Sequence, residues 1–193
     1  MSLLLFGFTC ILFTSCSLYY RARLGIKKPK VENFTSVQSS FSEHFHTAPK
    51  NLFVAIDSTS FINLFKIVSK QTTQLFNEKG YLVKMQDSGY CIAKAEYFIQ
   101  NLNSSTHVNL DTLYRITEIL KLIKPINNEM QCDFSTYDFI FIGYWSVWLG
   151  RGNKNVYNVY LEMSKKNDLK ICYIFINFDI MEEWGNISLK LEK

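Results

Sequence analysis

This 193-residue chain has five cysteines, the residue type here that can take part in the largest number of reactions: Cys10, Cys16, Cys91, Cys132 and Cys172. A thiolate can attack a disulfide, bind a metal ion or become covalently modified. No two of the five have the Cys-x-x-Cys spacing that is typical of redox and zinc sites. Cys91 and Cys132 are therefore candidate thiols that could also pair with each other. Cys172 lies within an apolar run and is expected to be a small core residue.

The other chemically active residue types form weaker patterns. The three histidines are His44, His46 and His107. They lack the matching Cys, Asp or Glu spacing of a zinc site, so no metal is expected. No Gly-rich phosphate loop is present, and no cofactor is expected. Residues 57–59 (Asp-Ser-Thr) indicate a helix cap rather than a nucleophile. Glu182 and Glu183 are adjacent, so they point apart and cannot act as a carboxylate pair.

Cys16 stands just after a short apolar run over residues 3–13. Eleven residues are too few to span a bilayer, which needs about 20. They suit the apolar core of a signal peptide. The sequence Phe13-Thr14-Ser15-Cys16 resembles a bacterial lipobox. The resemblance implies that residues 1–15 are a signal peptide, that cleavage precedes Cys16, and that its thiol carries the lipid.

Five positive charges follow this run: Arg21, Arg23, Lys27, Lys28 and Lys30. Residues 16–50 are polar without sustained periodicity and are expected to be a lipidated basic tether beside anionic headgroups. Two alternatives stay open. Residues 3–20 could remain as an uncleaved anchor, and the positive-inside rule would then place the body in the cytoplasm. The apolar run could also be a buried N-terminal helix.

Composition indicates one globular domain, over residues 51–193. Hydrophobic residues make up 48% of the chain and charged residues 20%, enough for a proper core. The net charge of +4 comes largely from the basic tether, which leaves the body nearly neutral. A nucleic-acid binder carries its basic residues on the folded domain, so nucleic acid is not expected as a partner.

The first half of this body shows four predicted elements. A buried strand is expected over residues 51–57 and a helix over residues 61–69. Two alternating segments within residues 73–85 predict a hairpin that turns at Gly80. Residues 109–124 predict an amphipathic helix that ends at Pro125. The inward faces of the two helices are expected to be Phe61, Leu64, Phe65 and Val68, and Leu110, Leu113, Ile116, Ile119, Leu120 and Ile123.

The last third predicts a strand over residues 137–144, a helix over 151–166 and a strand over 169–179. A strand, helix and strand in this order form a right-handed βαβ unit with parallel strands. The helix is expected to point Val156, Val159, Tyr160 and Met163 inward. A further helix is expected to start at Ile180, followed by a terminal edge strand over residues 187–191.

The turn inside this unit resembles the active-site turn of thioredoxin-like proteins. There, an aromatic-Trp-x-x-Trp run leads into Cys-Gly-Pro-Cys at a helix N-terminus, and Trp145, Trp148 and Gly150 match in place. Together with the lipobox, the chain resembles bacterial (Bacteroidetes-like) lipoproteins with a degenerate thioredoxin-like, peroxiredoxin-related domain, over residues 91–184. The resemblance implies an α/β fold, a thioredoxin-like three-layer sandwich with a central mixed sheet and a truncated or atypical C-terminal part.

The turn departs from that family at the residues that carry its chemistry. Leu149 and Gly152 stand where the nucleophilic and resolving cysteines would be, and Arg151 replaces the proline. Thiol–disulfide exchange requires a thiolate, so no catalytic residue is predicted here. The turn then has two interpretations. It either packs and shapes the core, or its helix N-terminus, with Arg151 and Asn153, binds an anion or a partner loop.

These observations favour a non-catalytic envelope lipoprotein that faces the periplasm, with the outer membrane preferred over the inner. Its expected partners are the membrane, through the lipid, and an unknown protein. Two alternatives remain. One is a thiol-dependent oxidoreductase that uses Cys91 or Cys132. The other is a cytoplasm-facing, signal-anchored protein.

Overall fold

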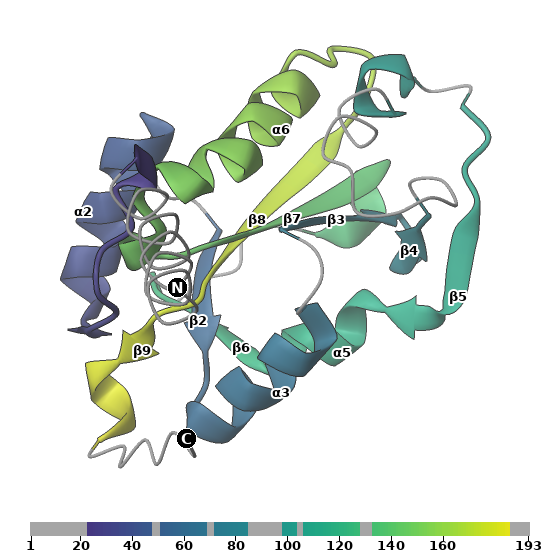
Figure 1. Cartoon of the computed structure of the whole chain (residues 1–193). Coiled ribbons are helices and arrows are strands. Elements are labelled where there is room, and N and C mark those ends of the chain that lie inside the picture. The colour runs from purple at the N-terminus through teal and green to yellow at the C-terminus, as the bar shows by residue number, and fades with distance from the viewer. Residues whose placement is uncertain are drawn as a thin grey trace, which may run out of the picture.

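The computed structural model describes residues 23–47, 51–68, 72–84, 98–103, 106–127 and 133–185. Within them a mixed seven-stranded sheet has the order β5-β4-β3-β7-β8-β2-β6, with helices on both faces (Figure 1). Its strands are β2 (Leu52–Ala55), β3 (Thr73–Asn77), β4 (Tyr81–Val83), β5 (Leu110–Arg115), β6 (Ile123–Pro125), β7 (Phe139–Trp145) and β8 (Ile171–Asn177). A separate parallel pair joins β1 (Val31–Glu32) to β9 (Ile180–Met181).

The α-helices are α2 (Phe34–Phe45), α3 (Ser58–Val68), α5 (Ile116–Leu120) and α6 (Lys154–Ser164). Three short 3₁₀ helices are η1 (Phe134–Thr136), η2 (Val147–Asn153) and η3 (Glu182–Trp184). Residues of α2 and α6 pack on one face of the sheet, and residues of α3 and α5 pack on the other. The expected α/β class with a central mixed sheet is therefore confirmed.

The predicted βαβ unit is present as β7, α6 and β8. The two strands are parallel neighbours in register from Phe139 with Ile171 to Trp145 with Asn177. β2 is parallel to β8, whereas β3 is antiparallel to β7. The predicted hairpin is also present, because β3 pairs antiparallel with β4. Its turn uses Gly80 at φ 76°, a conformation that favours glycine.

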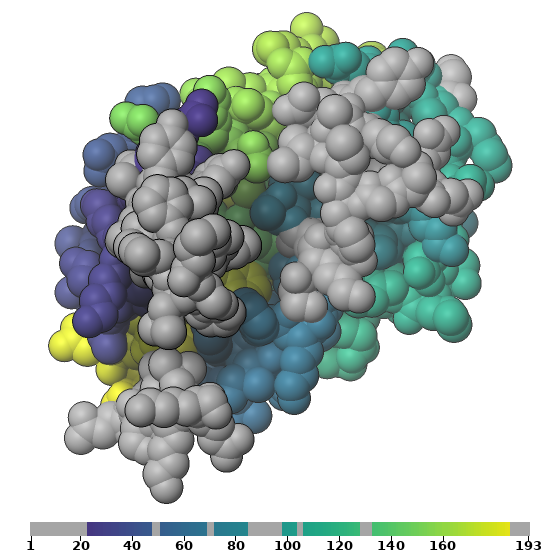
Figure 2. Space-filling model, viewed as in Figure 1, coloured from purple at the N-terminus to yellow at the C-terminus, as the bar shows by residue number. Residues whose placement is uncertain are grey.

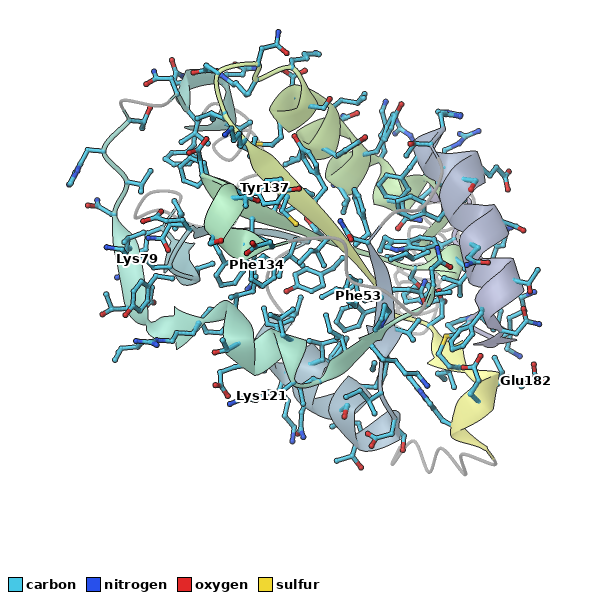
Figure 3. The ribbon with its side chains drawn as sticks, turned by 180° about the vertical axis from the view of Figure 1, so that it is seen from behind. Phe53, Lys79, Lys121, Phe134, Tyr137 and Glu182 are labelled. Carbon is cyan, nitrogen blue, oxygen red and sulfur yellow. The ribbon has the colours of Figure 1, made fainter. Side chains whose placement is uncertain are left out.

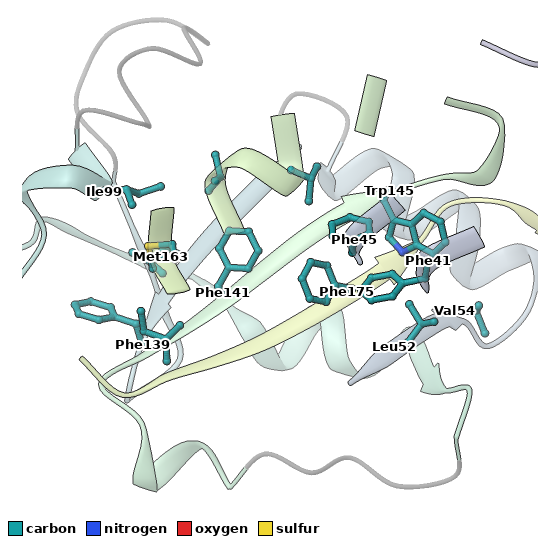
Figure 4. Close-up of a cluster of buried hydrophobic side chains, with 14 of the residues drawn as sticks. Phe41, Phe45, Leu52, Val54, Ile99, Phe139, Phe141, Trp145, Met163 and Phe175 are labelled. Carbon is teal, nitrogen blue, oxygen red and sulfur yellow. The ribbon is translucent and has the colours of Figure 1, made fainter. Parts of the chain in front are cut away.

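Side chains alternate between the two faces of the central strands, as the period of a strand requires. On β7, Phe139 and Phe141 belong to the cluster under α2 and α6, which Figure 4 shows from close by. Ile140 and Ile142 belong to the cluster over α3 and α5. Gly143 lets α6 approach, because a Cβ there would lie 2.7 Å from Val156 Cγ1. Both faces of the sheet are thus buried, which explains why its central strands are apolar throughout.

The helix predicted over residues 109–124 is wrong. Residues Leu110–Arg115 form the edge strand β5, which pairs with β4, and only Ile116–Leu120 are helical. Leu113, assigned to the inward stripe, is 96% exposed. The pairing of β5 with β4 is a long-range contact, and it overrides the local helical periodicity. Pro125 lies in the edge strand β6, where a missing N–H is tolerated.

The tether predicted over residues 16–50 is wrong where the structure describes it. Residues 34–45 form α2, whose Val37, Phe41 and Phe45 are buried in the core. Asn33 and Ser36 form a capping box at its start. The folded body therefore begins before residue 51. Three apolar residues at intervals of four were enough to order a helix that is otherwise rich in Ser, Gln and His.

Two smaller predictions need correction, and two others concern residues that the structure does not describe. Phe65 is 58% exposed rather than inward-facing. Ile180 begins β9, followed by η3, instead of an α-helix. The signal peptide over residues 1–15 and the edge strand over residues 187–191 lie outside the described residues. No helix in the described ranges is long and apolar enough to cross a membrane.

Candidate functional site

The carboxyl ends of the parallel strands β7, β8 and β2 meet at one edge of the sheet. In open α/β sheets, ligands bind in the crevice outside this edge. β7 continues there into η2 and then α6, and β8 continues into β9. The turn that the sequence singled out therefore lies where the fold class places its binding sites.

Asp179 organises this edge. It is 2% exposed, and both of its carboxylate oxygens accept hydrogen bonds. The Ser146 hydroxyl donates to Oδ1 at 2.7 Å. The Val147 backbone N–H and the Asn177 side-chain amide donate to Oδ2 at 2.7 and 2.6 Å. The carboxylate therefore ties the end of β8 to the start of η2.

Asn153 closes the same turn from its other end. Its side-chain amide donates to the Ser146 carbonyl at 2.8 Å and accepts from the Ser146 N–H at 3.2 Å. Asn153 is 2% exposed. Both ends of its side-chain amide thus hydrogen-bond to the backbone of Ser146 within the turn.

Two buried carboxylates shape the electrostatics of this edge. Burial raises the pKa of Asp179 above its ordinary value, against its three hydrogen bonds, and the nearby charge of Glu32 acts in the same direction as burial. Glu32 is 3% exposed. It accepts from the Ser36 hydroxyl at 2.6 Å and faces the Lys30 ammonium at 3.6 Å. Each acid thus has polar partners that offset the cost of removing it from water.

Residues 23–32, here called the N-terminal strap, cover the turn. The Lys27 N–H donates to the Trp148 carbonyl at 2.8 Å. The Arg151 guanidinium donates to the Arg23 carbonyl at 3.4 Å. At its far end the strap continues as β1, which pairs with β9. The segment expected to be a free tether is therefore fixed to the domain by its backbone.

Gly150 permits this close contact. Its φ of 51° lies in the region that favours glycine, and a Cβ there would lie 2.3 Å from the Gly25 carbonyl oxygen. At Gly152, by contrast, a Cβ would meet Leu149 at an ordinary 3.5 Å. The resemblance matched Gly150 to a glycine beside a cysteine, but here the glycine admits the strap.

The remaining residues of the turn between β7 and α6 have mixed environments. Trp145 ends β7, is fully buried, and packs edge-on against Phe41 and Phe45 at ring distances of 5.4 and 5.9 Å. Its indole N–H has no hydrogen-bond partner among the described residues. Leu149 and Gly152 are half-buried. For Trp145, the interpretation of the turn as part of the core holds.

Among the described residues the cysteine is Cys172, which lies near the start of β8 and away from this edge. Cys172 lies in β8, is 1% exposed and forms a disulfide, so it is more than a small core residue. Cys16, Cys91 and Cys132 lie outside the described residues. No group of three metal-ligating side chains occurs in the ranges that the structure describes.

Sequence reasoning missed the polar residues that build the edge. Asn177 and Asp179 are two residues apart at the end of an apolar strand, so they share one face of it. Ser146 follows the neighbouring parallel strand directly. Polar residues at the carboxyl ends of two parallel strands are a usable signal for a shared site. Glu32 carried no such signal, because only β1–β9 pairing brings it here.

The chemistry available to this cluster is limited. The Ser146 hydroxyl is hydrogen-bonded to the Asp179 carboxylate, as the hydroxyl of a serine nucleophile could be. However, Ser146 is 0% exposed and therefore closed to substrates. Asp57 accepts from the Ser60 N–H at 2.7 Å, which confirms the predicted helix cap, and this bond lowers the pKa of Asp57.

No protein-family model, curated protein or solved structure was found to match the chain.

Proposed function

We propose that this chain is a membrane-anchored envelope lipoprotein whose thioredoxin-like domain is redox-inactive and binds a protein partner. The carrying observation is the closed edge at the end of β7. By the resemblance, Leu149 and Gly152 stand at the positions of the cysteine pair. The Asp179 carboxylate accepts its hydrogen bonds from Ser146 and Val147, inside the protein, and the strap covers the turn. Such an edge favours a structural or binding role over thiol exchange.

The arrangement of elements supports the thioredoxin-like part of the proposal. A βαβ unit carries the turn at the end of its first strand, and an antiparallel strand, β3, lies beside that strand. The hairpin β3–β4 comes before the unit in this chain. That order makes the domain atypical of the family.

The location rests on two independent observations. Cys16 follows a signal-like apolar run in a lipobox-like sequence. Cys172 forms a disulfide, and structural disulfides are typical of oxidising compartments such as the periplasm. Together they favour a domain that faces the periplasm and is held by lipid on Cys16.

Intact mass and membrane fractionation of the natively expressed full chain test this location. Wild type is expected to lose fifteen residues, gain acyl mass and sediment with membranes. Cys16→Ala should keep its signal sequence and gain no lipid. Cys10→Ala is the matched control, because it removes a cysteine of the same apolar leader and should be processed as wild type. An unmodified full-length wild type would overturn the lipoprotein assignment and turn the basic stretch into a cytoplasmic topology signal.

The competing thiol-enzyme function is tested on the same material. Cys91 or Cys132 is the disulfide partner of Cys172 in the processed lipoprotein, so alkylation followed by mass spectrometry over a range of pH identifies the remaining thiol and gives its reactivity. Redox inactivity predicts that this thiol does not alkylate rapidly below neutral pH. Rapid alkylation there would mark a low-pKa thiolate and favour the oxidoreductase.

A further inference from the structure

The strap, which is hydrogen-bonded to the turn before α6, and the start of α6 both carry exposed positive charge. The strap has exposed Arg23, Lys27, Lys28 and Lys30, and the domain adds exposed Arg151 and Lys154. The Arg151 guanidinium donates to the Arg23 carbonyl of the strap, and the Lys154 backbone N–H donates to the Arg151 carbonyl. Side chains three apart in a 3₁₀ helix eclipse one another, so positions 151 and 154 face the same way.

Few carboxylates oppose this charge. Glu32 is buried against Lys30, and Asp179 is buried among its hydrogen bonds. The exposed Glu182 and Glu183 follow β9, at the end of the strap that is remote from Arg23. Between Arg23 and Lys30, and from Ser146 to Lys154, the chain has no acidic residue. These two segments therefore carry six exposed cations and no exposed acidic residue, whereas the exposed Glu43 lies on α2, which packs against η2 and α6.

The strap also determines how this face can lie relative to a membrane. Arg23 is seven residues after Cys16, a length that spans at most about 25 Å when extended. Because the strap is hydrogen-bonded to the turn at Arg23 and Lys27, the domain cannot rotate freely relative to the strap. Anionic headgroups attract basic residues within a Debye length of about 8–10 Å.

We propose that the strap and the start of α6 form one membrane-docking face, which holds the domain edge-on against anionic phospholipid. The inference rests on the proposed lipid anchor and goes beyond it. A plain tether would bring only the strap to the lipid. A docked strap brings Arg151 and Lys154 of the domain to the lipid as well.

Lysine footprinting on the full, acylated protein tests the proposal. The protein is reconstituted into phosphatidylcholine vesicles with or without about one third phosphatidylglycerol, and acetylation of each lysine is followed by mass spectrometry. Lys154, Lys27, Lys28 and Lys30 should be acetylated roughly fivefold more slowly on the anionic vesicles. About 1 M salt should abolish the difference, because it shortens the Debye length to about 3 Å.

Lysines at the other end of the molecule serve as internal controls. Lys79 lies in the β3–β4 turn, far from Glu182 and the strap-bound β9 (Figure 3). In the space-filling view, the purple residues of the strap and α2 and the teal residues of β5 occupy opposite sides (Figure 2). Lys79 and Lys84 should therefore react at the same rate on both kinds of vesicle.

Lys154 decides between docking and tethering. Protection of the three strap lysines with an unprotected Lys154 would overturn the proposal, because only the strap would then touch the lipid. Gly150→Ala adds a Cβ that collides with the Gly25 carbonyl, so it should release the strap from the turn. Lys154 should then lose its protection by the lipid, while the strap lysines stay protected. Gly152→Ala, two residues away, has room for its Cβ and should behave as wild type. A circular dichroism melt of each variant verifies that it is folded.

Failure of the anchor and failure of the docking face give different results. Absence of acyl mass refutes the lipoprotein, and the same footprint is then recorded with the unacylated chain added to the vesicles. Slower acetylation of Lys154 on phosphatidylglycerol would still support the face. Equal rates, with or without the acyl chain, would refute it.

Discussion

At the scale of single residues, Asp179 holds the edge of the sheet together. Its carboxylate accepts hydrogen bonds from Ser146 and Val147 on one chain segment and from Asn177 on another. The polar groups of this edge thus satisfy one another within the described residues, so its geometry serves packing.

Asp179→Ala should lower the free energy of unfolding by about 1–3 kcal/mol, because it leaves buried donors on Val147 and Asn177 without an acceptor. Asp179→Asn should recover most of that loss. Its amide oxygen still accepts from those two donors, and its NH₂ can donate to the Ser146 hydroxyl. Urea unfolding monitored by circular dichroism measures both variants. Equal losses for Ala and Asn would show that the charge matters rather than the hydrogen bonds.

The same carboxyl should make stability depend on pH. Burial raises its folded-state pKa above the ordinary 3.8, so between the two values the native state holds a proton that the unfolded state has released. The contribution of Asp179 to stability is therefore largest at low pH and falls as pH rises through this window. Asp179→Asn lacks this dependence. Its stability relative to wild type should rise from about pH 4 to neutral pH, and a flat difference would contradict the assignment.

At the scale of elements, α2 shows that a few apolar residues are enough to form a helix when they can pack on the face of a sheet. Phe41 stacks on Phe45 at 4.4 Å and meets Phe175 of β8 edge-on at 4.9 Å. Residues 109–124 show the opposite case. Their stripe satisfied the helical period well, yet β5 forms because the edge of β4 offered backbone partners. Periodicity describes a segment by itself, whereas pairing depends on its neighbour.

Phe41→Ala should cost about 3–5 kcal/mol, since it removes a side chain that is 1% exposed and leaves a cavity between α2 and the sheet. The neighbouring Ser42 is exposed, so Ser42→Ala should change stability by less than about 0.5 kcal/mol. Thermal unfolding of the two variants compares them directly. A small loss for Phe41→Ala would mean that α2 is not part of the cooperative core.

At the scale of the whole molecule, the disulfide of Cys172 and the strap both join segments that are distant in sequence. Reduction should destabilise the folded chain by about 2–4 kcal/mol, because the cross-link limits the unfolded ensemble. The melting temperature with and without a reductant measures this effect. Cys172→Ala should melt at one temperature in both conditions, and a reductant effect that persists in this variant would place the stabilising cross-link elsewhere.

The sequence by itself determined the parts of this protein whose partners are near in the chain. The βαβ unit, the hairpin at Gly80 and the helix cap at Asp57 all follow from local periodicity, turn chemistry and residue identity. Only the tertiary structure decided the rest. β5, α2, the strap on Gly150 and the burial of Glu32 beside Asp179 depend on long-range contacts. Their free energy comes from surfaces that exist only once the sheet has formed, so no local pattern could specify them.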